Sequence, residues 1–235
     1  MSNIKCVLFD CMETLIDIVE IPILRDYALW AYDGSGVEHY WRNFDEFFQN
    51  YICAKEIIDK RLPDNKEYDL IERFEQVACI KFKDDKEKIT EISKKLLKNY
   101  WKTYTHKCYI KEEVVEVLSN LADKYQLGVV SNFKVKNGVE ELLAKNGIIE
   151  YFNSITTSVN VGWRKPHPNI YDIAIDNLGI APCEIVFVGD DYINDYVQPK
   201  KLGLNTIFLD RYNKFQDVQQ KVPNFYELMN SLNRL

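Results

Sequence analysis

Long apolar runs are missing from this chain of 235 residues. The first apolar run, within MSNIKCVLFD, is short and is closed by Asp10. A secretory signal or a membrane-spanning helix needs a longer stretch, so both are excluded for this run. We therefore expect a cytosolic protein without a membrane partner.

A concentration of basic residues is missing as well. The chain carries 30 Lys and Arg against 36 Asp and Glu, which gives a net charge of −6. Even in the lysine-rich stretch KFKDDKEKITEISKKLLK the bases are interleaved with acids, a pattern typical of a solvated helix face. Binding to nucleic acid requires a concentrated basic surface, so we expect a small-molecule partner instead.

The six cysteines form no Cys-x-x-Cys pair, which disfavours a zinc site. A reducing compartment disfavours disulfides too. Cys11 stands beside Asp10, but the surrounding carboxylates oppose the low pKa that a reactive thiol needs. Cys11 is therefore interpreted as a packing residue.

Short β-branched runs without a helical period are what the sequence does contain. Buried strands are predicted at five of them: residues 4–10, 126–132, 153–157, 184–190 and 205–210. Helical patterns lie between the later runs, and one of them begins at Pro168 and ends at Gly179. Strands that alternate with helices predict an α/β fold with a parallel, Rossmann-like sheet.

Residues 17–108 follow a different pattern. They contain no comparable strand, are rich in aromatic residues, and show helical spacing in segments such as VEHYWRNFDEFFQNYI and KEKITEISKKLLKNYW. We interpret this region as an inserted helical cap whose aromatic residues mostly form a bundle core. The α/β core would then comprise residues 1–16 and 109–235.

Polar side chains stand at or just after the ends of the predicted strands. They are Asp10, Ser131, Asn132, Asp190, Asp191 and Asp195. Lys165 lies in the loop GWRKPHP, just before the helix that begins at Pro168. Ligands of parallel sheets bind outside the carboxyl ends of the strands, so these groups are expected to converge on one place.

Four motifs in this order resemble those of the haloacid dehalogenase superfamily of aspartate-nucleophile hydrolases. FDCMETL is similar to the first motif (Asp-x-Asp-x-Thr), VVSN to the second, RKPHP to the third and GDDYINDYVQPKKLGL to the fourth. The resemblance covers the whole predicted core, and the family also carries a helical cap after the first motif. It implies that Asp10 is the nucleophile, activated by neighbouring positive charge.

The resemblance implies roles for the groups around this nucleophile. Thr14, Ser131 and Asn132 would hold the oxygens of the transferred group, and Lys165 would add positive charge where negative charge develops. Asp195 would orient Lys165 or a metal-bound water.

A magnesium site is implied at the same place. Asp10 and Asp190 would supply two hard oxygen ligands for Mg²⁺, and the resemblance adds the main-chain carbonyl of Met12. Because that third ligand is backbone, the methionine side chain does not abolish the site. Asp191 is assigned to the surroundings of the metal.

Two residues outside these roles need an interpretation. Arg42 follows Trp41 at a distance along the sequence from Asp10 similar to that of a halide-contacting Trp-Arg pair in the dehalogenases. It is therefore a candidate substrate-binding residue, and a solvent-exposed arginine is the plainer alternative. His167, between two prolines, is interpreted as a structural turn residue because the resemblance assigns nothing to that position.

Met12 is the main departure from the first motif. In the family's phosphatases an aspartate here protonates the leaving group and then activates water, which a thioether cannot do. The loss would cost roughly 10²–10⁴-fold on alkyl phosphates. Glu13 is not expected to substitute, because adjacent residues of an extended segment point to opposite sides.

Three alternatives stay open: a leaving group that needs no proton, an acid from substrate or cap, or a binding protein with little turnover.

The first and fourth motifs favour different functions. Dehalogenases of the superfamily also lack the second aspartate, but they lack the metal-binding aspartate that stands here at Asp190. Tyr171 matches a tyrosine of the dehalogenases at a position that is common among their phosphatase relatives too. The function we predict is Mg²⁺-dependent hydrolysis of a small phosphorylated metabolite through an aspartyl-phosphate at Asp10. The alternatives are a metal-independent 2-haloacid dehalogenase, or a ligand-binding or regulatory homologue with weak catalysis.

Overall fold

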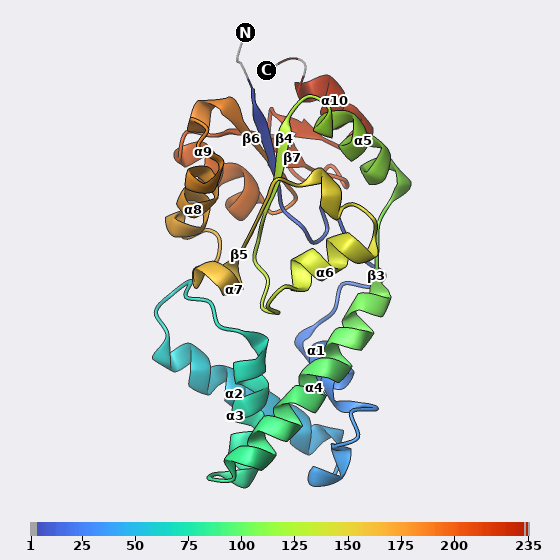
Figure 1. Ribbon diagram of the computed structural model, residues 1–235, viewed down its shortest axis with the longest axis vertical. Helices are drawn as coiled ribbons and strands as arrows, with labels where there is room; N and C mark the ends of the chain where they lie inside the picture. The colour runs from blue at the N-terminus through green and yellow to red at the C-terminus, as the bar shows by residue number, and fades with distance from the viewer. Residues whose placement is uncertain (1–3, 233, 235) are drawn as a thin grey trace. The chain divides into compact units, whose positions relative to one another are not determined.

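Two compact units make up the computed structural model, which describes residues 4–232 and 234. The α/β unit is formed by the chain up to Asp17 and from Tyr109 onward, and the helical unit is Ile18–Cys108. The sequence placed the start of the insertion at residue 17, one residue before this division. Figure 1 shows the sheet within the first unit and the long helices within the second.

Six parallel strands form the sheet of the α/β unit, in the order β5-β4-β1-β6-β7-β8. Their bounds are β1 Cys6–Phe9, β4 Gln126–Ser131, β5 Ser154–Thr157, β6 Ile185–Gly189, β7 Asn205–Leu209 and β8 Lys221–Val222. The predicted α/β class with a Rossmann-like sheet is confirmed. The strand β8 was not predicted, since two residues carry too little pattern to be recognised.

Helices cover both faces of this sheet. On one side lie α8 (Pro168–Leu178) and α9 (Gln198–Lys201), and on the other α5 (Glu112–Ala122), α6 (Gly138–Lys145) and α10 (Phe225–Leu232) (Figure 1). Leu8 packs in a cluster with Tyr171 of α8, whereas the neighbouring Phe9 stacks on Phe225 of α10 with ring centroids 5.9 Å apart. Successive residues of β1 therefore face opposite layers, which explains its unbroken apolar run.

Several short segments complete the α/β unit. They are α7 (Ser158–Val161) and the single turns η2 (Ile149–Tyr151), η3 (Pro182–Glu184) and η4 (Tyr192–Val197). The chain leaves this unit through β2 (Asp17–Ile18) and returns through β3 (Cys108–Tyr109), and these two strands pair as a separate small sheet.

Four helices and one short turn form the helical unit. They are α1 (Leu24–Tyr32), η1 (Glu38–Tyr40), α2 (Phe44–Arg61), α3 (Leu70–Phe82) and α4 (Lys86–Lys107). Side-chain oxygens of Asn43, Asp69 and Asp85 accept backbone N–H groups at the starts of α2, α3 and α4. Tyr51 and Phe74 are buried and lie 6.1 Å apart between ring centroids, so aromatic residues do form the core of this bundle.

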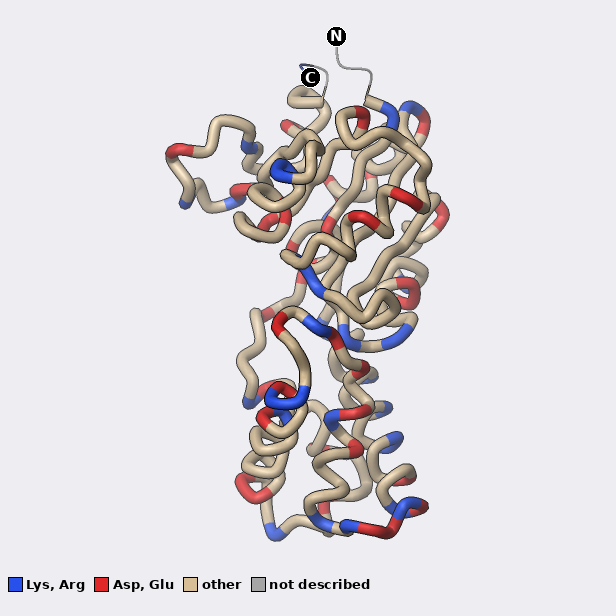
Figure 2. The backbone as a smooth tube through the Cα atoms, turned by 90° about the vertical axis from the view of Figure 1, so that its left-hand side faces the viewer, with Lys and Arg blue, Asp and Glu red and all other residues tan. Residues whose placement is uncertain are grey.

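Charged residues of both signs are interspersed along both units (Figure 2). In α4, for example, Lys95 pairs with Glu91 one turn earlier, as on a solvated helix face. None of the described helices combines the length and the apolar character that crossing a membrane requires.

Candidate active site

The carboxyl edge of the sheet brings the first functional groups together. Asp10 directly follows β1, and its backbone N–H donates to the carbonyl of Val188 in β6, 2.9 Å away. Asp190 directly follows β6, and Ser131 ends β4 on the other side of β1. Because all these strands are parallel, their carboxyl ends lie at one edge, as the sequence predicted.

Lys165 lies at the centre of the site. Its Nζ donates to Oδ1 of Asp10 and to Oδ1 of Asp195, both at 2.7 Å. The three side chains are buried, with Lys165 only 4% exposed. Burial alone would lower the pKa of Lys165, but the charges of Asp10 and Asp195 raise it above its usual range. The nucleophile candidate therefore has a permanent positive charge beside it.

Asp190 adds a third carboxyl group to the cluster formed by Asp10, Asp195 and the ammonium of Lys165. Burial and the nearby Asp10 charge raise the pKa of Asp190 to about 7, although the Thr14 hydroxyl donates to its Oδ1 at 3.2 Å. Burial likewise raises the pKa of Asp195 to about 8. Carboxylate oxygens of Asp10, Asp190 and Asp195 lie within 4.8 Å of one another. Three carboxyl groups beside one ammonium supply the hard oxygen donors that Mg²⁺ prefers.

Asp195 reaches the cluster from η4, a wide π-helical turn of the kind found at functional sites. Its Oδ2 accepts the N–H of Asp191 at 3.0 Å, so both of its oxygens are engaged. A Cβ atom at Gly189 would lie 2.4 Å from this Oδ2, and only glycine therefore permits the arrangement. Sequence reasoning did not assign this role to Gly189, although its place directly before Asp190 was a usable signal.

Asp191 and Tyr171 act on the same turn. The Asp191 carboxylate accepts the N–H groups of Ile193 and Asn194 at the start of η4. The Tyr171 hydroxyl donates to the carbonyl of Asn194 at 2.5 Å, and burial raises the pKa of Tyr171 so that it stays a donor. Both side chains therefore fix the segment that carries Asp195.

Asn132 holds Lys165 from the other side. Its amide nitrogen donates to the carbonyl of Lys165 at 3.0 Å, and its amide oxygen accepts the N–H of Lys165 at 2.7 Å. This pair of bonds fixes the main chain from which the Lys165 ammonium extends. A substrate contact of Asn132 or of the buried Ser131 stays a prediction.

The nucleophile loop is a tight turn. The N–H groups of Leu15 and Ile16 both donate to the carbonyl of Cys11, and the N–H of Glu13 donates to the carbonyl of Ile16. Glu13 has a φ of 59°, in the left-handed region that favours glycine. The expectation of an extended segment at Met12 and Glu13 is therefore wrong, because the turn requires one left-handed residue. The Met12 carbonyl as a metal ligand stays a prediction.

Arg42 and His167 both form hydrogen bonds with residues near them in the sequence. Arg42 belongs to the helical unit, where its Nε donates to Glu46 at 3.1 Å and its side chain is 85% exposed. Its role in substrate binding stays a prediction. His167 caps α8 by accepting the N–H of Asn169, which agrees with its interpretation as a turn residue.

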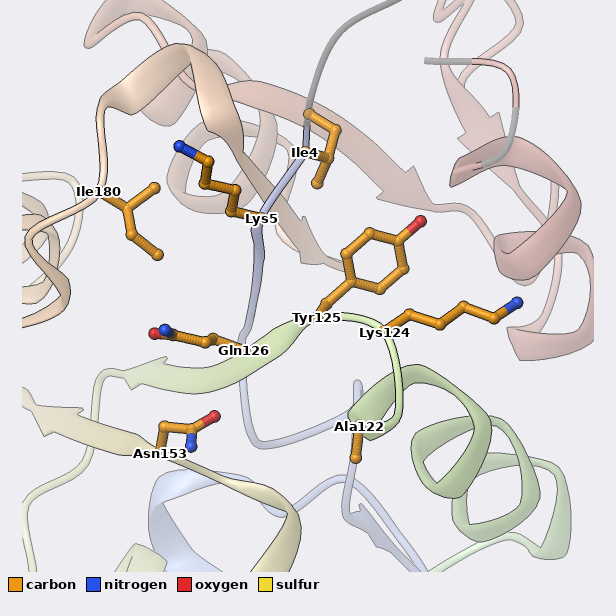
Figure 3. A pocket seen from close by; sticks show the side chains of 8 residues that line it. All are labelled: Ile4, Lys5, Ala122, Lys124, Tyr125, Gln126, Asn153 and Ile180. Atoms are coloured by element: carbon orange, nitrogen blue, oxygen red, sulfur yellow. The ribbon is translucent and has the colours of Figure 1, made fainter.

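A hollow of about 600 Å³ lies elsewhere, at the amino end of the sheet. Figure 3 shows that Lys5 and Gln126, at the starts of β1 and β4, line it together with Tyr125 and Asn153. Its lining contains no carboxylate, histidine, cysteine or hydroxyl nucleophile from serine or threonine. The predicted nucleophile and its neighbouring carboxyl groups lie instead at the opposite, carboxyl edge of the sheet.

Comparison with known proteins adds three findings. The family model described as "Haloacid dehalogenase-like hydrolase" matches residues 41–209, which include the second, third and fourth motifs. The "Haloacid dehalogenase-like hydrolase domain-containing protein 3" of Danio rerio is 36% identical over 84 residues, which cover 36% of this chain and 34% of the relative. The "Glyceraldehyde 3-phosphate phosphatase" of Methanopyrus kandleri is 33% identical over 119 residues, 48% of this chain and 50% of the relative. The matches thus span a third to a half of these relatives.

A solved structure matches nearly the entire chain. The 2-haloacid dehalogenase from Pseudomonas syringae pv. Tomato DC3000 has a TM-score of 0.79 and covers 98% of this chain and 99% of its own. Its sequence is 19% identical, so the match establishes similarity of fold.

Proposed function

Because the chain belongs to the haloacid dehalogenase-like hydrolases, we propose that it hydrolyses a small phosphorylated metabolite with Mg²⁺ bound and Asp10 as the nucleophile. The observation that carries this proposal is the cluster of Asp10, Asp190 and Asp195 around the single ammonium of Lys165. Attack on the carbon of a haloacid needs no divalent cation, and it would leave the half-buried carboxyl group of Asp190 without a role.

The contacts of Asp10 support nucleophilic attack by its carboxylate. An Asp10 oxygen forms a bond to phosphorus, the bond from phosphorus to the leaving oxygen breaks, and its electron pair goes with the leaving group. Water then attacks phosphorus, the bond between phosphorus and the Asp10 oxygen breaks, and its electron pair restores the carboxylate. The proton of the attacking water goes to the released phosphate or to solvent. Lys165 keeps Asp10 in place through both steps and lowers the repulsion between the carboxylate and an anionic substrate. When bound by Asp10 and Asp190, Mg²⁺ would neutralise charge on the phosphoryl oxygens.

The leaving group would have to depart without a proton from residue 12. Met12 has no proton to give, and the carboxylates of Asp191 and Asp195 are held by backbone N–H groups or by Lys165. We infer that the favoured substrates have a leaving group that is stable as an anion. Acyl phosphates and aryl phosphates meet this requirement, while simple alkyl phosphates do not. The phosphatase among the relatives supports a phosphorylated substrate in general.

The test compares substrates and metal conditions. We expect turnover of p-nitrophenyl phosphate and acetyl phosphate in the presence of Mg²⁺, its loss in EDTA, and its loss in Asp10→Asn. A control variant, Asp217→Asn, removes an exposed carboxylate of the same unit and should retain full activity.

Two other outcomes would replace the proposal. Metal-independent release of halide from 2-chloropropionate would assign the dehalogenase function, which the missing acid at Met12 favours. No turnover of either substrate class, with Mg²⁺ still bound, would assign a binding function.

A further inference from the structure

Arg211 is the second residue after β7 and contacts the nucleophile loop at two points. One terminal guanidinium nitrogen donates to Oδ1 of Asp17 at 2.5 Å, and the other terminal nitrogen donates to the carbonyl of Thr14 at 3.0 Å. The side chains of Arg211 and Asp17 are only 13% and 5% exposed. A planar guanidinium presents its donors at a fixed spacing, so these two bonds fix the carbonyl of Thr14 relative to Asp17.

Asp17 also pairs with the segment that follows β3, where the chain returns to the α/β unit. It is the first residue of β2, where the chain leaves the α/β unit, and its Oδ2 pairs with Nζ of Lys111 at 2.9 Å. Lys111 stands two residues after β3, through which the chain returns. The buried Asp17 carboxylate therefore pairs with one residue after β7 and with one residue after β3.

Thr14 contacts both Arg211 and the acidic cluster. Its carbonyl accepts from Arg211, while its hydroxyl donates to Oδ1 of Asp190 at 3.2 Å. Asp10 lies four residues earlier in the same tight turn. A catalytic arrangement tolerates deviations of only about 0.5 Å, so the loop needs support from outside itself.

We propose that Arg211 is a positioning residue, which holds the loop from Asp10 to Asp17 in the conformation that aligns Asp10, Thr14 and Asp190. Its effect on the reaction rests on the proposed function, whereas its effect on the loop can be measured separately. Exposed ion pairs contribute little to stability, but this pair is largely shielded from solvent, and Arg211 also binds a backbone carbonyl.

Three variants separate positioning from general stability. Arg211→Gln removes the charge and the forked geometry. Arg211→Lys keeps the charge, but a compact ammonium does not span both acceptors as a guanidinium does. Lys221→Gln is the matched control, because Lys221 donates to Asp210, the residue before Arg211, and lies on the neighbouring strand β8.

The first measurement is hydrogen–deuterium exchange of the peptide that covers residues 9–17. We expect exchange in Arg211→Gln to rise about tenfold, because charge-assisted bonds that order the turn are lost. Arg211→Lys should give a smaller rise, and Lys221→Gln should match the wild type. In the Arg211→Gln background, Asp17→Asn should add only what its pairing with Lys111 contributes, because the bond between Asp17 and Arg211 is already lost.

The second measurement is the Mg²⁺-dependent turnover of p-nitrophenyl phosphate. We expect kcat to fall by about 10²-fold in Arg211→Gln with little change in KM, because a loop displaced by about 1 Å misaligns the nucleophile. Arg211→Lys should recover part of kcat. If Arg211→Gln does not fold, the partial effects in Arg211→Lys decide the question by themselves.

Equal exchange and equal kcat in the Arg211 variants and in Lys221→Gln would overturn the proposal. A wild type that turns over no phosphate would refute the proposed function instead. In that event the exchange data alone confirm or overturn the role of Arg211 in ordering the loop.

Discussion

At position 12 the nucleophile loop carries a thioether, which has no exchangeable proton to give to a leaving group. Met12 nevertheless fits the loop, since it forms a β-bridge with Ile16 inside the tight turn. The same turn puts Glu13 in the left-handed region, so its carboxylate cannot be placed by the alternation of an extended strand.

Met12→Asp tests the account of this position. The new carboxyl would supply a proton donor, so we expect hydrolysis of an alkyl phosphate to rise by about 10²-fold or more, toward the range of general acid catalysis. Acetyl phosphate, whose leaving group needs no proton, should change little. The comparison of kcat/KM for the two substrates is the measurement, and Met12→Asn is the control of similar size without an acid. An equal gain in Met12→Asn, or no gain in Met12→Asp, would refute the account.

At the scale of elements, the positions of Asp10, Ser131 and Asp190 could be predicted because strand ends in a parallel sheet share one edge. Other contacts lay beyond the sequence. Asn132 could be placed at the end of β4, but not its two bonds to the main chain of Lys165, 33 positions away. The contact between Asp17 and Arg211 joins residues 194 positions apart, and no periodic pattern encodes such a pair.

The position of Asp195 in the π-helical turn η4 depends on the absence of a side chain at Gly189. Gly189→Ala would place a Cβ 2.4 Å from the Asp195 carboxylate, which must move away from Lys165. We expect a loss of about 1–3 kcal/mol in the free energy of unfolding, as for other overpacked sites. Activity on p-nitrophenyl phosphate should fall as well. Ile193→Ala, at an exposed position of the same turn, is the control and should change neither. Urea unfolding and kcat measurements on both variants would show whether Asp195 tolerates the added methyl group.

For the molecule as a whole, the acidic cluster opposes folding when no cation compensates it. The pKa of Asp190 is raised to about 7 by burial and by Asp10, whereas an aspartate in the unfolded chain titrates near about 4. The folded protein therefore holds this proton more tightly than the unfolded chain. The contribution of this bound proton to the free energy of unfolding is complete below about pH 4 and is lost as the pH rises through about 7.

The variant Asp190→Asn separates the destabilising effect of the Asp190 charge from the stabilising effect of bound Mg²⁺. An amide keeps an acceptor for the Thr14 hydroxyl without the charge, so in EDTA at pH 8 the variant should be more stable by on the order of 1 kcal/mol or more. At pH 4 the two proteins should differ little, since Asp190 is protonated in the folded wild type. Millimolar Mg²⁺ should stabilise the wild type through preferential binding to the folded state, and the variant much less. Urea unfolding at both pH values, with and without Mg²⁺, measures all three effects, and Asp217→Asn serves as the exposed control. A variant that is less stable than the wild type in EDTA at pH 8 would mean that the Asp190 charge is compensated within the protein, and the case for a divalent cation at this cluster would fail.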